Sequence, residues 1–469
     1  MPKFRAILVE DEPSAASFTS EALEAAGFDV VLYEDALSAQ KHADSRNDLI
    51  DLLVLDRRLP LRTGEPPRDA VGDDLLTAML LKHPDLVAIV FSGHTGFEHH
   101  QFATAERGVV SMGNGTYEFD RVRLFQKGQS LEFDAYVAKV AGALSALQDI
   151  QILGVDVGEL SPHDKRVLRR VAFEMGGSSV TPRALTGGMT DSAVWLCLIE
   201  GQQSAAAHVV VKRHVKTREP GGFQTLCPAQ ITAGTVGTVR GFCGGYYVTI
   251  QQLVGADPTP LFELIVSDES SAVAVVKELR SHLAAMPAGQ RLNVAIDQIA
   301  APFSDWDQLV QRASARNISV PPSSRIAATT VGPRHGDLHA GNVLVAAGRP
   351  VVIDFDSQTV GSPLVDVLTL QLGMLFHSDS PIFGGDWPTP EQCSQFTAEV
   401  FLEGCPAPDY FSVLADWIAE VTTSPRELAA VVLGYAVRQL KYADVLANER
   451  ATARATALAR WAAEVIDAD

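Results

Sequence analysis

The stretch His335-Gly-Asp337-Leu-His-Ala-Gly-Asn342, followed by the apolar residues that lead to Asp354, decides how the second half of the chain folds. Asp337 and Asn342 are five residues apart on one predicted loop. Two short apolar segments separated by Ala-Ala-Gly-Arg-Pro come next, and they predict a β-hairpin that carries Asp354 back beside Asn342. A polar loop followed by an acid at the end of a strand is the plain alternative, but this order, spacing and hairpin seldom coincide by accident.

The same residue types suit the transfer of a phosphoryl group. That reaction needs a carboxylate that takes the proton of the acceptor hydroxyl, oxygen ligands for Mg²⁺, and a cation on the phosphates of ATP. We expect Asp337 to face the acceptor, and the side-chain oxygens of Asn342 and Asp354 to face the metal. The sequence therefore predicts an ATP-dependent phosphotransferase site.

Support for the nucleotide is expected upstream. Residues 185–195 predict a strand, a turn and a second strand, with Gly187 and Gly188 at the bend and their backbone amides near the ATP phosphates. Lys212 ends the apolar strand that starts at His208, which is where a phosphate-binding lysine should project. A surface lysine at a strand end is the alternative.

These motifs resemble the aminoglycoside phosphotransferase and choline kinase group of protein-kinase-like enzymes over residues 183–469. The resemblance implies a two-lobed α+β fold, with an N-lobe at 183–256 and a helical C-lobe at 257–469. It makes Asp337 the catalytic base and uses Mg²⁺ and ATP. It implies that Asn342 and Asp354 bind the metal and that His335 and Asp366 support the catalytic loop. On the nucleotide side it implies a phosphate contact at Lys212 and an adenine-facing hinge at Gln251 and Leu253. The implied nucleotide loop consists of Gly187, Gly188, Met189 and Thr190.

The first 148 residues have a different pattern. Short apolar runs rich in Val, Ile and Leu alternate with amphipathic segments, which predicts an α/β domain with a doubly wound five-stranded parallel sheet. The predicted strands are Arg5–Val9, Asp29–Tyr33, Leu52–Leu55, Val87–Phe91 and Val122–Phe125, and the clearest helices are Ser14–Ala26, Asp73–His83 and Ala135–Leu147.

Polar residues follow four of those strands. Glu10 and Asp11 follow the first, Asp56 the third, Ser92 the fourth and Lys127 the fifth. Ligands bind at the carboxyl ends of parallel strands, so the three carboxylates predict a Mg²⁺ pocket with Asp56 as nucleophile. Ser92 and Lys127 are placed to bind the oxygens of a phosphoryl group on Asp56.

This segment resembles the flavodoxin-like receiver domain of two-component response regulators. The resemblance implies that Asp56 accepts a phosphoryl group from a sensor histidine kinase, beside a metal held by Glu10, Asp11 and Asp56. It makes Ser92 and Lys127 the signalling pair. Four features depart from the usual pattern: a long loop at Leu61–Asp74, a long stretch from 95 to 120, a Gly at 128 after the lysine, and a Leu at the switch position 124.

Residues 149–182 form the junction, which we expect to be a helical linker. Ser161 and Pro162 predict the start of a helix there, and Gly176-Gly177 predicts its end. This helix resembles the opening helix of many helix-turn-helix regulators, but the place of a recognition helix holds the Gly-rich run from Thr186.

Charge and cysteine usage narrow the class of protein further. The 38 basic and 57 acidic residues give a net charge of -19, which argues against nucleic acid and membrane surfaces as partners. The five cysteines have irregular spacing and no CxxC motif, and no apolar segment reaches membrane-spanning length. We therefore expect a reduced, cytoplasmic protein.

Three functions follow from these features. The first is a response regulator whose receiver controls a kinase acting on an unknown small-molecule or protein acceptor, with a homodimer left open. The second is a nucleotide-binding pseudokinase scaffold. The family that the segment resembles pairs its lysine with a glutamate, but here the only acid between Lys212 and Tyr246 is Glu219, which lies very close to Lys212. The third, a DNA-binding regulator, is disfavoured by the charge and by the Gly-rich run.

Overall fold

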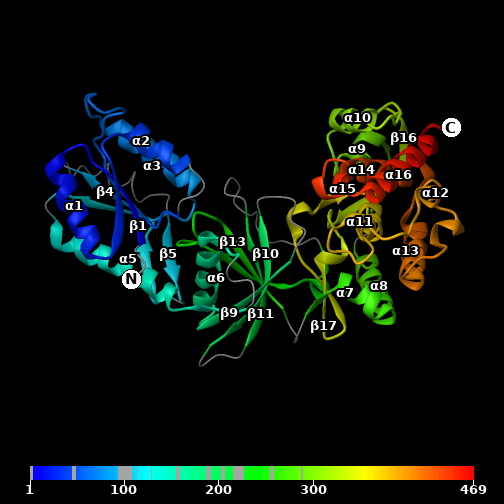
Figure 1. The fold of residues 1–469 in the computed structure, drawn as a ribbon, viewed down its shortest axis with the longest axis horizontal. Coiled ribbons are helices and arrows are strands. Elements are labelled where there is room, and N and C mark those ends of the chain that lie inside the picture. The colour runs from blue at the N-terminus through cyan, green and yellow to red at the C-terminus, as the bar shows by residue number, and fades with distance from the viewer. Residues whose placement is uncertain are drawn as a thin grey trace. The chain divides into compact units, whose positions relative to one another are not determined.

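The computed structural model describes residues 4–44, 49–92, 108–113, 115–127, 129–154, 159–185, 192–201, 206–214, 227–253, 258–286 and 289–468. The chain divides into two compact units, Met1–Gly221 with Thr235–Gln252, and Gly222–Gly234 with Leu253–Asp469. The first unit contains a parallel and an antiparallel sheet, and the second is mainly helical (Figure 1).

The N-terminal sheet has five strands, all parallel, in the order β2-β1-β3-β4-β7. This is the strand order of flavodoxin-like proteins, so the predicted doubly wound fold is confirmed. Helices α1 and α5 share a core with one face of the sheet, and α2 and α3 share a core with the other. The strands are β1 (Phe4–Val9), β2 (Phe28–Tyr33), β3 (Leu52–Asp56), β4 (Ala88–Ser92) and β7 (Val122–Gln126), and the helices are α1 (Pro13–Ala25), α2 (Ala36–Asp44), α3 (Asp69–Lys82) and α5 (Ser130–Gln148).

A β-hairpin that the sequence did not predict lies between β4 and β7. Its strands, β5 (Val109–Met112) and β6 (Tyr117–Asp120), pair antiparallel and are separate from the five-stranded sheet. In β5 every second residue is buried, as expected of a strand with one face on a core. Val110, Met112 and Phe119 join the core of α1 and α5.

The rest of the first unit is a six-stranded sheet in the order β12-β13-β11-β10-β9-β8. Helix α6 (Pro162–Glu174) packs on it and begins with a capping box in which Ser161 and Asp164 each bond the other's backbone. The segment expected to be a helical linker therefore also contributes two strands to this sheet. The strands are β8 (Gln151–Ile152), β9 (Ser179–Ala184), β10 (Ala193–Glu200), β11 (Ala207–Arg213), β12 (Gly234–Val239) and β13 (Val248–Gln252).

The second unit is built around α11 (Leu364–Phe376), every residue of which is buried. A helix buried on all sides belongs at the centre of a large core, and one cluster of apolar residues surrounds it. The surrounding helices are α7 (Leu261–Ser267), α8 (Glu269–Ala284), α9 (Ile296–Ala300), α10 (Trp306–Ser314), α12 (Pro390–Cys393), α13 (Pro408–Val421), α14 (Pro425–Gln439), α15 (Ala443–Ala447) and α16 (Glu449–Asp467).

The predicted hairpin is present in this unit as β17 (Val343–Ala346) and β18 (Arg349–Val352), which pair antiparallel. The short β14 (Thr259–Pro260) adds a third strand to it. A second sheet, which the sequence did not predict, contains β15 (Gln290–Ala295), β16 (Ile326–Arg334) and β19 (Thr359–Gly361). Strand β16 runs directly into the His335–Asn342 loop and so positions it.

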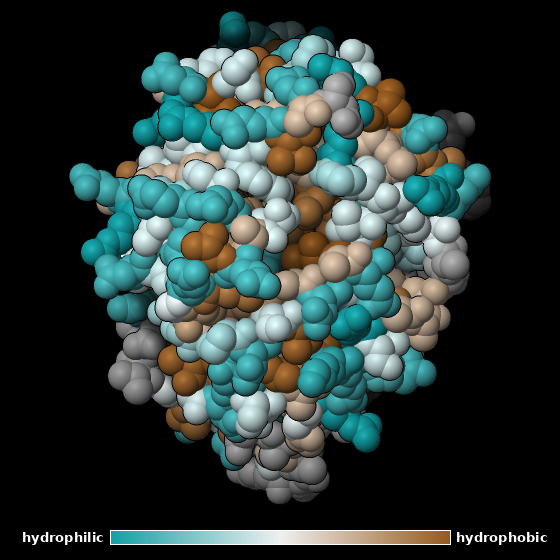
Figure 2. All heavy atoms as spheres, turned by 90° about the vertical axis from the view of Figure 1, so that its right-hand side faces the viewer, coloured by the Kyte–Doolittle hydropathy of each residue, from teal (hydrophilic) through white to brown (hydrophobic). Residues whose placement is uncertain are grey.

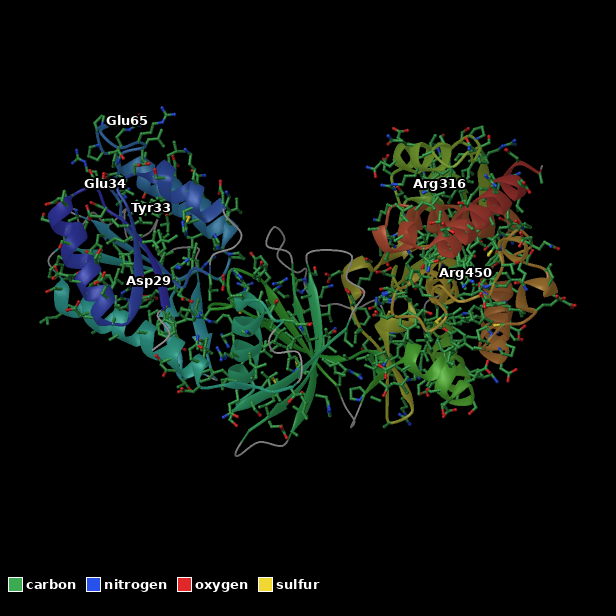
Figure 3. All side chains as sticks on the ribbon, in the orientation of Figure 1. Asp29, Tyr33, Glu34, Glu65, Arg316 and Arg450 are labelled. Carbon is green, nitrogen blue, oxygen red and sulfur yellow. The ribbon has the colours of Figure 1, made fainter. Side chains whose placement is uncertain are left out.

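Charged side chains cover the surfaces of the two units. Figure 3 labels exposed examples, Asp29 and Glu65 on the first unit and Arg316 and Arg450 on the second. Figure 2 shows a mostly hydrophilic face, with hydrophobic residues visible near its centre and in smaller patches elsewhere on it. Among the described residues, no helix combines the length and the apolar character needed to cross a bilayer.

Candidate phosphoryl-transfer sites

The acids at the end of the parallel sheet converge as predicted. Glu10 and Asp56 are buried, with exposed fractions of 3% and 5%, and Asp11 beside them is partly buried. One carboxylate oxygen from each of the three lies within 4.8 Å of the others. The parallel strands β1 and β3 are neighbours, so their carboxyl ends bring the three side chains to one edge.

Lys127 closes this acidic cluster. Its Nζ lies 2.6 Å from Oδ2 of Asp56 and 3.5 Å from Oε2 of Glu10. Burial acts to lower the pKa of Lys127, but the hydrogen bond to Asp56 and the nearby acids outweigh it and raise that pKa. Lys127 is therefore a permanent cation at the carboxylate predicted to be phosphorylated.

Burial opposes the ionisation of two of the acids, Glu10 and Asp11. Burial, and then the charge of Asp56, raise the pKa of Glu10 to about 7. Burial raises the pKa of Asp11 as well. Buried carboxylates that resist ionisation so close together form a set of hard oxygen donors that a divalent cation would stabilise, so these residues fit Mg²⁺.

The remaining two receiver predictions have different outcomes. Ser92 is the last residue of β4, but its side chain lies outside the part of the chain that the structure describes. Leu124, at the switch position, lies on β7 and is partly buried against the core of α2 and α3.

The loop after β16 is held from below by Asp366 of α11. Its two carboxylate oxygens accept hydrogen bonds from the backbone N–H groups of His335, at 2.8 Å, and Gly336, at 2.7 Å. The His335 side chain is fully buried and its Nε2 donates to the carbonyl of Ile353 at 2.9 Å. These bonds fix the backbone that leads into Asp337.

Hydrogen bonds also place the predicted metal ligands beside Asp337. The Nδ2 of Asn342 donates to the backbone carbonyl of Asp337 at 2.8 Å, so the amide oxygen of Asn342 takes no part in this bond. The N–H of Ile353 donates to the carbonyl of Asn342 at 3.0 Å, so the next residue, Asp354, lies at the same loop. Asp354 has a left-handed backbone with φ of 63°. The structure thus brings Asp337, Asn342 and Asp354 together.

A cation that sequence reasoning missed faces the predicted base. The Nη1 of Arg438 lies 3.6 Å from Oδ1 of Asp337. Burial acts to raise the pKa of Asp337, but the charges of His339, Arg438 and other groups outweigh it and lower that pKa. Burial lowers the pKa of His339 to about 4, so Arg438 is the cation at Asp337 near neutral pH. Arg438 is about a hundred residues from the motif in sequence, and no pattern marks it.

Of the predicted nucleotide-side residues that the structure describes, Lys212 and Gln251 lie in the first unit and Leu253 in the second. Lys212 is on β11, half-buried, opposite Val194 of β10 and Thr249 of β13. Gln251 is on β13, and Leu253 directly after it is buried. The other predicted residues of this group, together with Glu219, lie outside the described residues: Gly187, Gly188, Met189 and Thr190.

Comparisons with known proteins agree with both resemblances. A family model for the phosphotransferase enzyme family matches residues 272–392. A search of curated proteins found no match. Among solved structures, a CheY-like receiver domain protein from Methanospirillum hungatei is 17% identical and covers 30% of this chain and 99% of its own, with a TM-score of 0.22.

Solved kinases match the remainder of the chain. A choline/ethanolamine kinase family protein from Mesorhizobium loti is 13% identical and covers 61% of this chain and 88% of its own, with a TM-score of 0.33. A choline kinase from Cryptosporidium parvum is 12% identical and covers 62% of this chain and 90% of its own, also with a TM-score of 0.33. The strand order of the N-terminal sheet and the family match at 272–392 thus agree with the predicted receiver-like and phosphotransferase-like domains.

Proposed function

We propose that the chain is a two-component response regulator whose output is an ATP-dependent phosphotransferase. The observation that carries the proposal is the hydrogen-bonded loop that gathers Asp337, Asn342 and Asp354 above the Asp366 carboxylate. A loop that only connected β16 to β17 would not need two backbone amides fixed by one fully buried carboxylate.

Each residue of this site has a defined role in the proposal. Asp337 takes the proton of the acceptor hydroxyl, and Asn342 and Asp354 would hold Mg²⁺, which supplies charge stabilisation to the phosphoryl group when bound. Lys212 binds the phosphates of ATP. The supporting roles are the nucleotide loop at 187–190, the adenine contact at Gln251 and Leu253, and the fixing of the loop by His335 and Asp366.

The receiver supplies the regulation. Asp56 accepts a phosphoryl group from a sensor histidine kinase, with Glu10 and Asp11 as the other acids that would hold Mg²⁺. Lys127, together with Ser92, then binds the new phosphoryl oxygens. This role is supported by the 2.6 Å approach of Lys127 to Asp56, because a phosphoryl group on Asp56 must change that contact.

Buried polar contacts join the receiver sheet to α6 within the first unit, and these contacts support regulation. Arg166 of α6 pairs with Asp51, the residue before β3, and each side chain is 3% exposed. Strand β3 runs from there to Asp56. Arg170, with 1% exposed, donates to the carbonyls of Ser111 at 2.8 Å and Gly241 at 3.1 Å. A shift of β3 or of the β5–β6 hairpin would therefore reach α6.

Apolar packing continues this contact. Phe119 of the hairpin meets Phe242 edge-on, with ring centroids 5.5 Å apart, and both belong to one core cluster. Phe242 follows β12 of the antiparallel sheet. A Cβ built on Gly241 would lie only 2.0 Å from Val110. The receiver and the antiparallel sheet thus share an interior, which supports coupling between them.

The experiment uses the purified full chain with ATP, Mg²⁺ and acetyl phosphate as phosphodonor. We expect Asp337→Asn to abolish the release of ADP, and Asp56→Asn to abolish any change in that release when acetyl phosphate is added. Full ADP release by Asp337→Asn would exclude this site. A rate in wild-type protein that acetyl phosphate never changes would exclude the regulation.

A pseudokinase scaffold is the second candidate function. The related kinases pair their phosphate-binding lysine with a glutamate. Between Lys212 and Tyr246 the only acid is Glu219, which lies very close to Lys212 in sequence and so departs from that pattern. Binding of Mg·ATP without transfer to any acceptor would favour it. In either case we propose a cytoplasmic protein, with a receiver at 1–148, a junction at 149–182 and kinase-like lobes at 183–256 and 257–469.

A further inference from the structure

The cation beside the predicted base bears on the acceptor. Arg438 and Asp337 have exposed side-chain fractions of 22% and 30%, and their nearest N and O atoms are 3.6 Å apart. Both therefore reach solvent at one place. A base that takes the proton of an acceptor must touch that acceptor, so a molecule that meets Asp337 also meets the Arg438 guanidinium.

Arg438 is held so that part of its guanidinium stays available. Its Nε donates to the hydroxyl of Tyr442 at 2.8 Å, which fixes one edge of the group. The contact of Nη1 with Asp337 is longer than the 2.7–2.9 Å typical of a charge-assisted hydrogen bond. Within the described parts of the chain, Nη2 makes no hydrogen bond. A planar fork with open donors is the geometry that binds carboxylates and phosphates.

Two histidines also lie beside Asp337. His339 and His377 are buried, with ring centroids 4.6 Å apart. The Nζ of the exposed Lys441 lies 4.6 Å from the centre of the Tyr442 ring. A positively charged acceptor at Asp337 would therefore meet a fixed guanidinium at close range.

We propose that the acceptor is an alcohol that carries a carboxylate or phosphate group, and that Arg438 binds this anion. The inference rests on the proposed phosphotransferase function. The acceptor hydroxyl oxygen forms a bond to the γ-phosphorus of ATP, the bond from that phosphorus to the ADP oxygen breaks, and the hydroxyl proton passes to Asp337. Arg438 determines specificity, because it contacts the anionic group rather than the reacting oxygen.

Binding tests the proposal directly. The full chain, loaded with Mg²⁺ and a non-hydrolysable ATP analogue, is titrated at millimolar concentration with three- to seven-carbon hydroxy acids and sugar phosphates. The set is completed by matched compounds without the negative charge. For the anions glycerate and glycerol 3-phosphate, for example, glycerol is the neutral match and choline is the cationic one. We expect only anionic members to bind, and the comparison of glycerate-type with phosphate-type members identifies the anion.

Variants assign the binding to Arg438. We expect Arg438→Met to weaken the anionic ligand about 10- to 100-fold, as for the loss of a charge-assisted hydrogen bond, with nucleotide affinity unchanged. Arg438→Lys should restore part of the affinity. The neighbouring Lys441→Met, which removes an exposed charge, should have a much smaller effect. With an acceptor that turns over, the change should appear in KM for the acceptor.

The outcomes separate this inference from the proposed function. Three results would each overturn the inference. They are tighter binding of choline than of any anion, no binding of any anion, and unchanged anion affinity in Arg438→Met. Anion binding that depends on Arg438 without any phosphoryl transfer would leave the anion site standing and refute the enzyme. Transfer of phosphate to cationic alcohols would support the enzyme and refute the anion site.

Discussion

The Nζ of Lys127 lies 2.6 Å from Oδ2 of Asp56, so the carboxylate that we propose to be phosphorylated already has an ammonium partner. A phosphoryl group on Asp56 would take this partner over, because it carries more negative charge. We expect incubation with acetyl phosphate and Mg²⁺ to add one phosphoryl group, detected in the intact mass of the protein. Lys127→Met should lower the equilibrium constant for phosphorylation about 10- to 100-fold, because a charge-assisted hydrogen bond is worth about 1.5–3 kcal/mol.

The control for that measurement is Asp56→Asn, which has nearly the same shape and no nucleophilic carboxylate. It should show no added mass under the same conditions. A phosphoryl group that still appears in Asp56→Asn would mean that another residue is the acceptor.

The pKa of Glu10 predicts how the receiver responds to pH. Burial and Asp56 raise that pKa to about 7 from its ordinary 4.5, so the folded state favours the protonated carboxyl. Its contribution to stability is fully present below pH 4.5 and is lost as pH rises through 7. The shift corresponds to a contribution on the order of 3 kcal/mol.

Glu10→Gln isolates this effect, because glutamine is a neutral side chain of similar shape. Without metal, we expect the variant to have a higher melting temperature than wild type at pH 8 and nearly the same one at pH 5. Mg²⁺ at pH 8 should raise the melting temperature of wild type more than that of the variant. Equal stabilisation of both by Mg²⁺ would contradict a metal site that includes Glu10.

The sequence predicted those elements whose signals are local. The strands of the parallel sheet are apolar runs, and the Asp337–Asn342 loop has a fixed spacing, so both could be read from neighbouring residues. The β5–β6 hairpin has only four residues in each strand, and only three of the eight are buried, which gives no clear apolar run. Arg438 could not be predicted as part of the site, because only the packing of α14 brings it to Asp337.

The pair Arg166 and Asp51 should contribute strongly to the stability of the first unit. Both side chains are 3% exposed, and Oδ2 of Asp51 also accepts the backbone N–H of Arg5 at 2.9 Å. Asp51→Asn keeps an acceptor for that N–H but leaves Arg166 buried without its counter-charge. We expect a loss of about 3 kcal/mol in the free energy of unfolding, measured by calorimetry on the full chain.

An exposed pair in the same sheet serves as the control. Arg5 and Asp29 lie 3.7 Å apart with exposed fractions of 37% and 53%, so Asp29→Ala should cost less than about 1 kcal/mol. The double variant Asp51→Asn, Arg166→Met should be more stable than the single Asp51→Asn, because no charge is then buried alone. Equal costs for Asp51→Asn and Asp29→Ala would show that the buried pair does not hold the receiver to α6.

Gly336 provides the sharpest test of the catalytic loop. Its φ is +88°, and a Cβ added there would lie 2.3 Å from the backbone carbonyl oxygen of Ser357. Gly336→Ala must therefore displace the residue that stands between His335 and Asp337. A displacement of about 1 Å at a reacting group can cost a factor of about 100 in rate, so we expect at least that loss in ADP release.

Gly348, in the turn between β17 and β18, provides the control. Alanine at this position strains the backbone as it does at Gly336, but it makes no steric clash. Gly348 also has a positive φ, +76°, but a Cβ added there meets nothing within 4 Å. Gly348→Ala should lower stability by about 1 kcal/mol through backbone strain alone and leave ADP release near the wild-type rate. Equal losses of activity in the two variants would contradict this role of Gly336, and so would full activity in Gly336→Ala. In either case the close contact of Gly336 with Ser357 would not position Asp337. The Asp366 hydrogen bonds would then have to hold the loop.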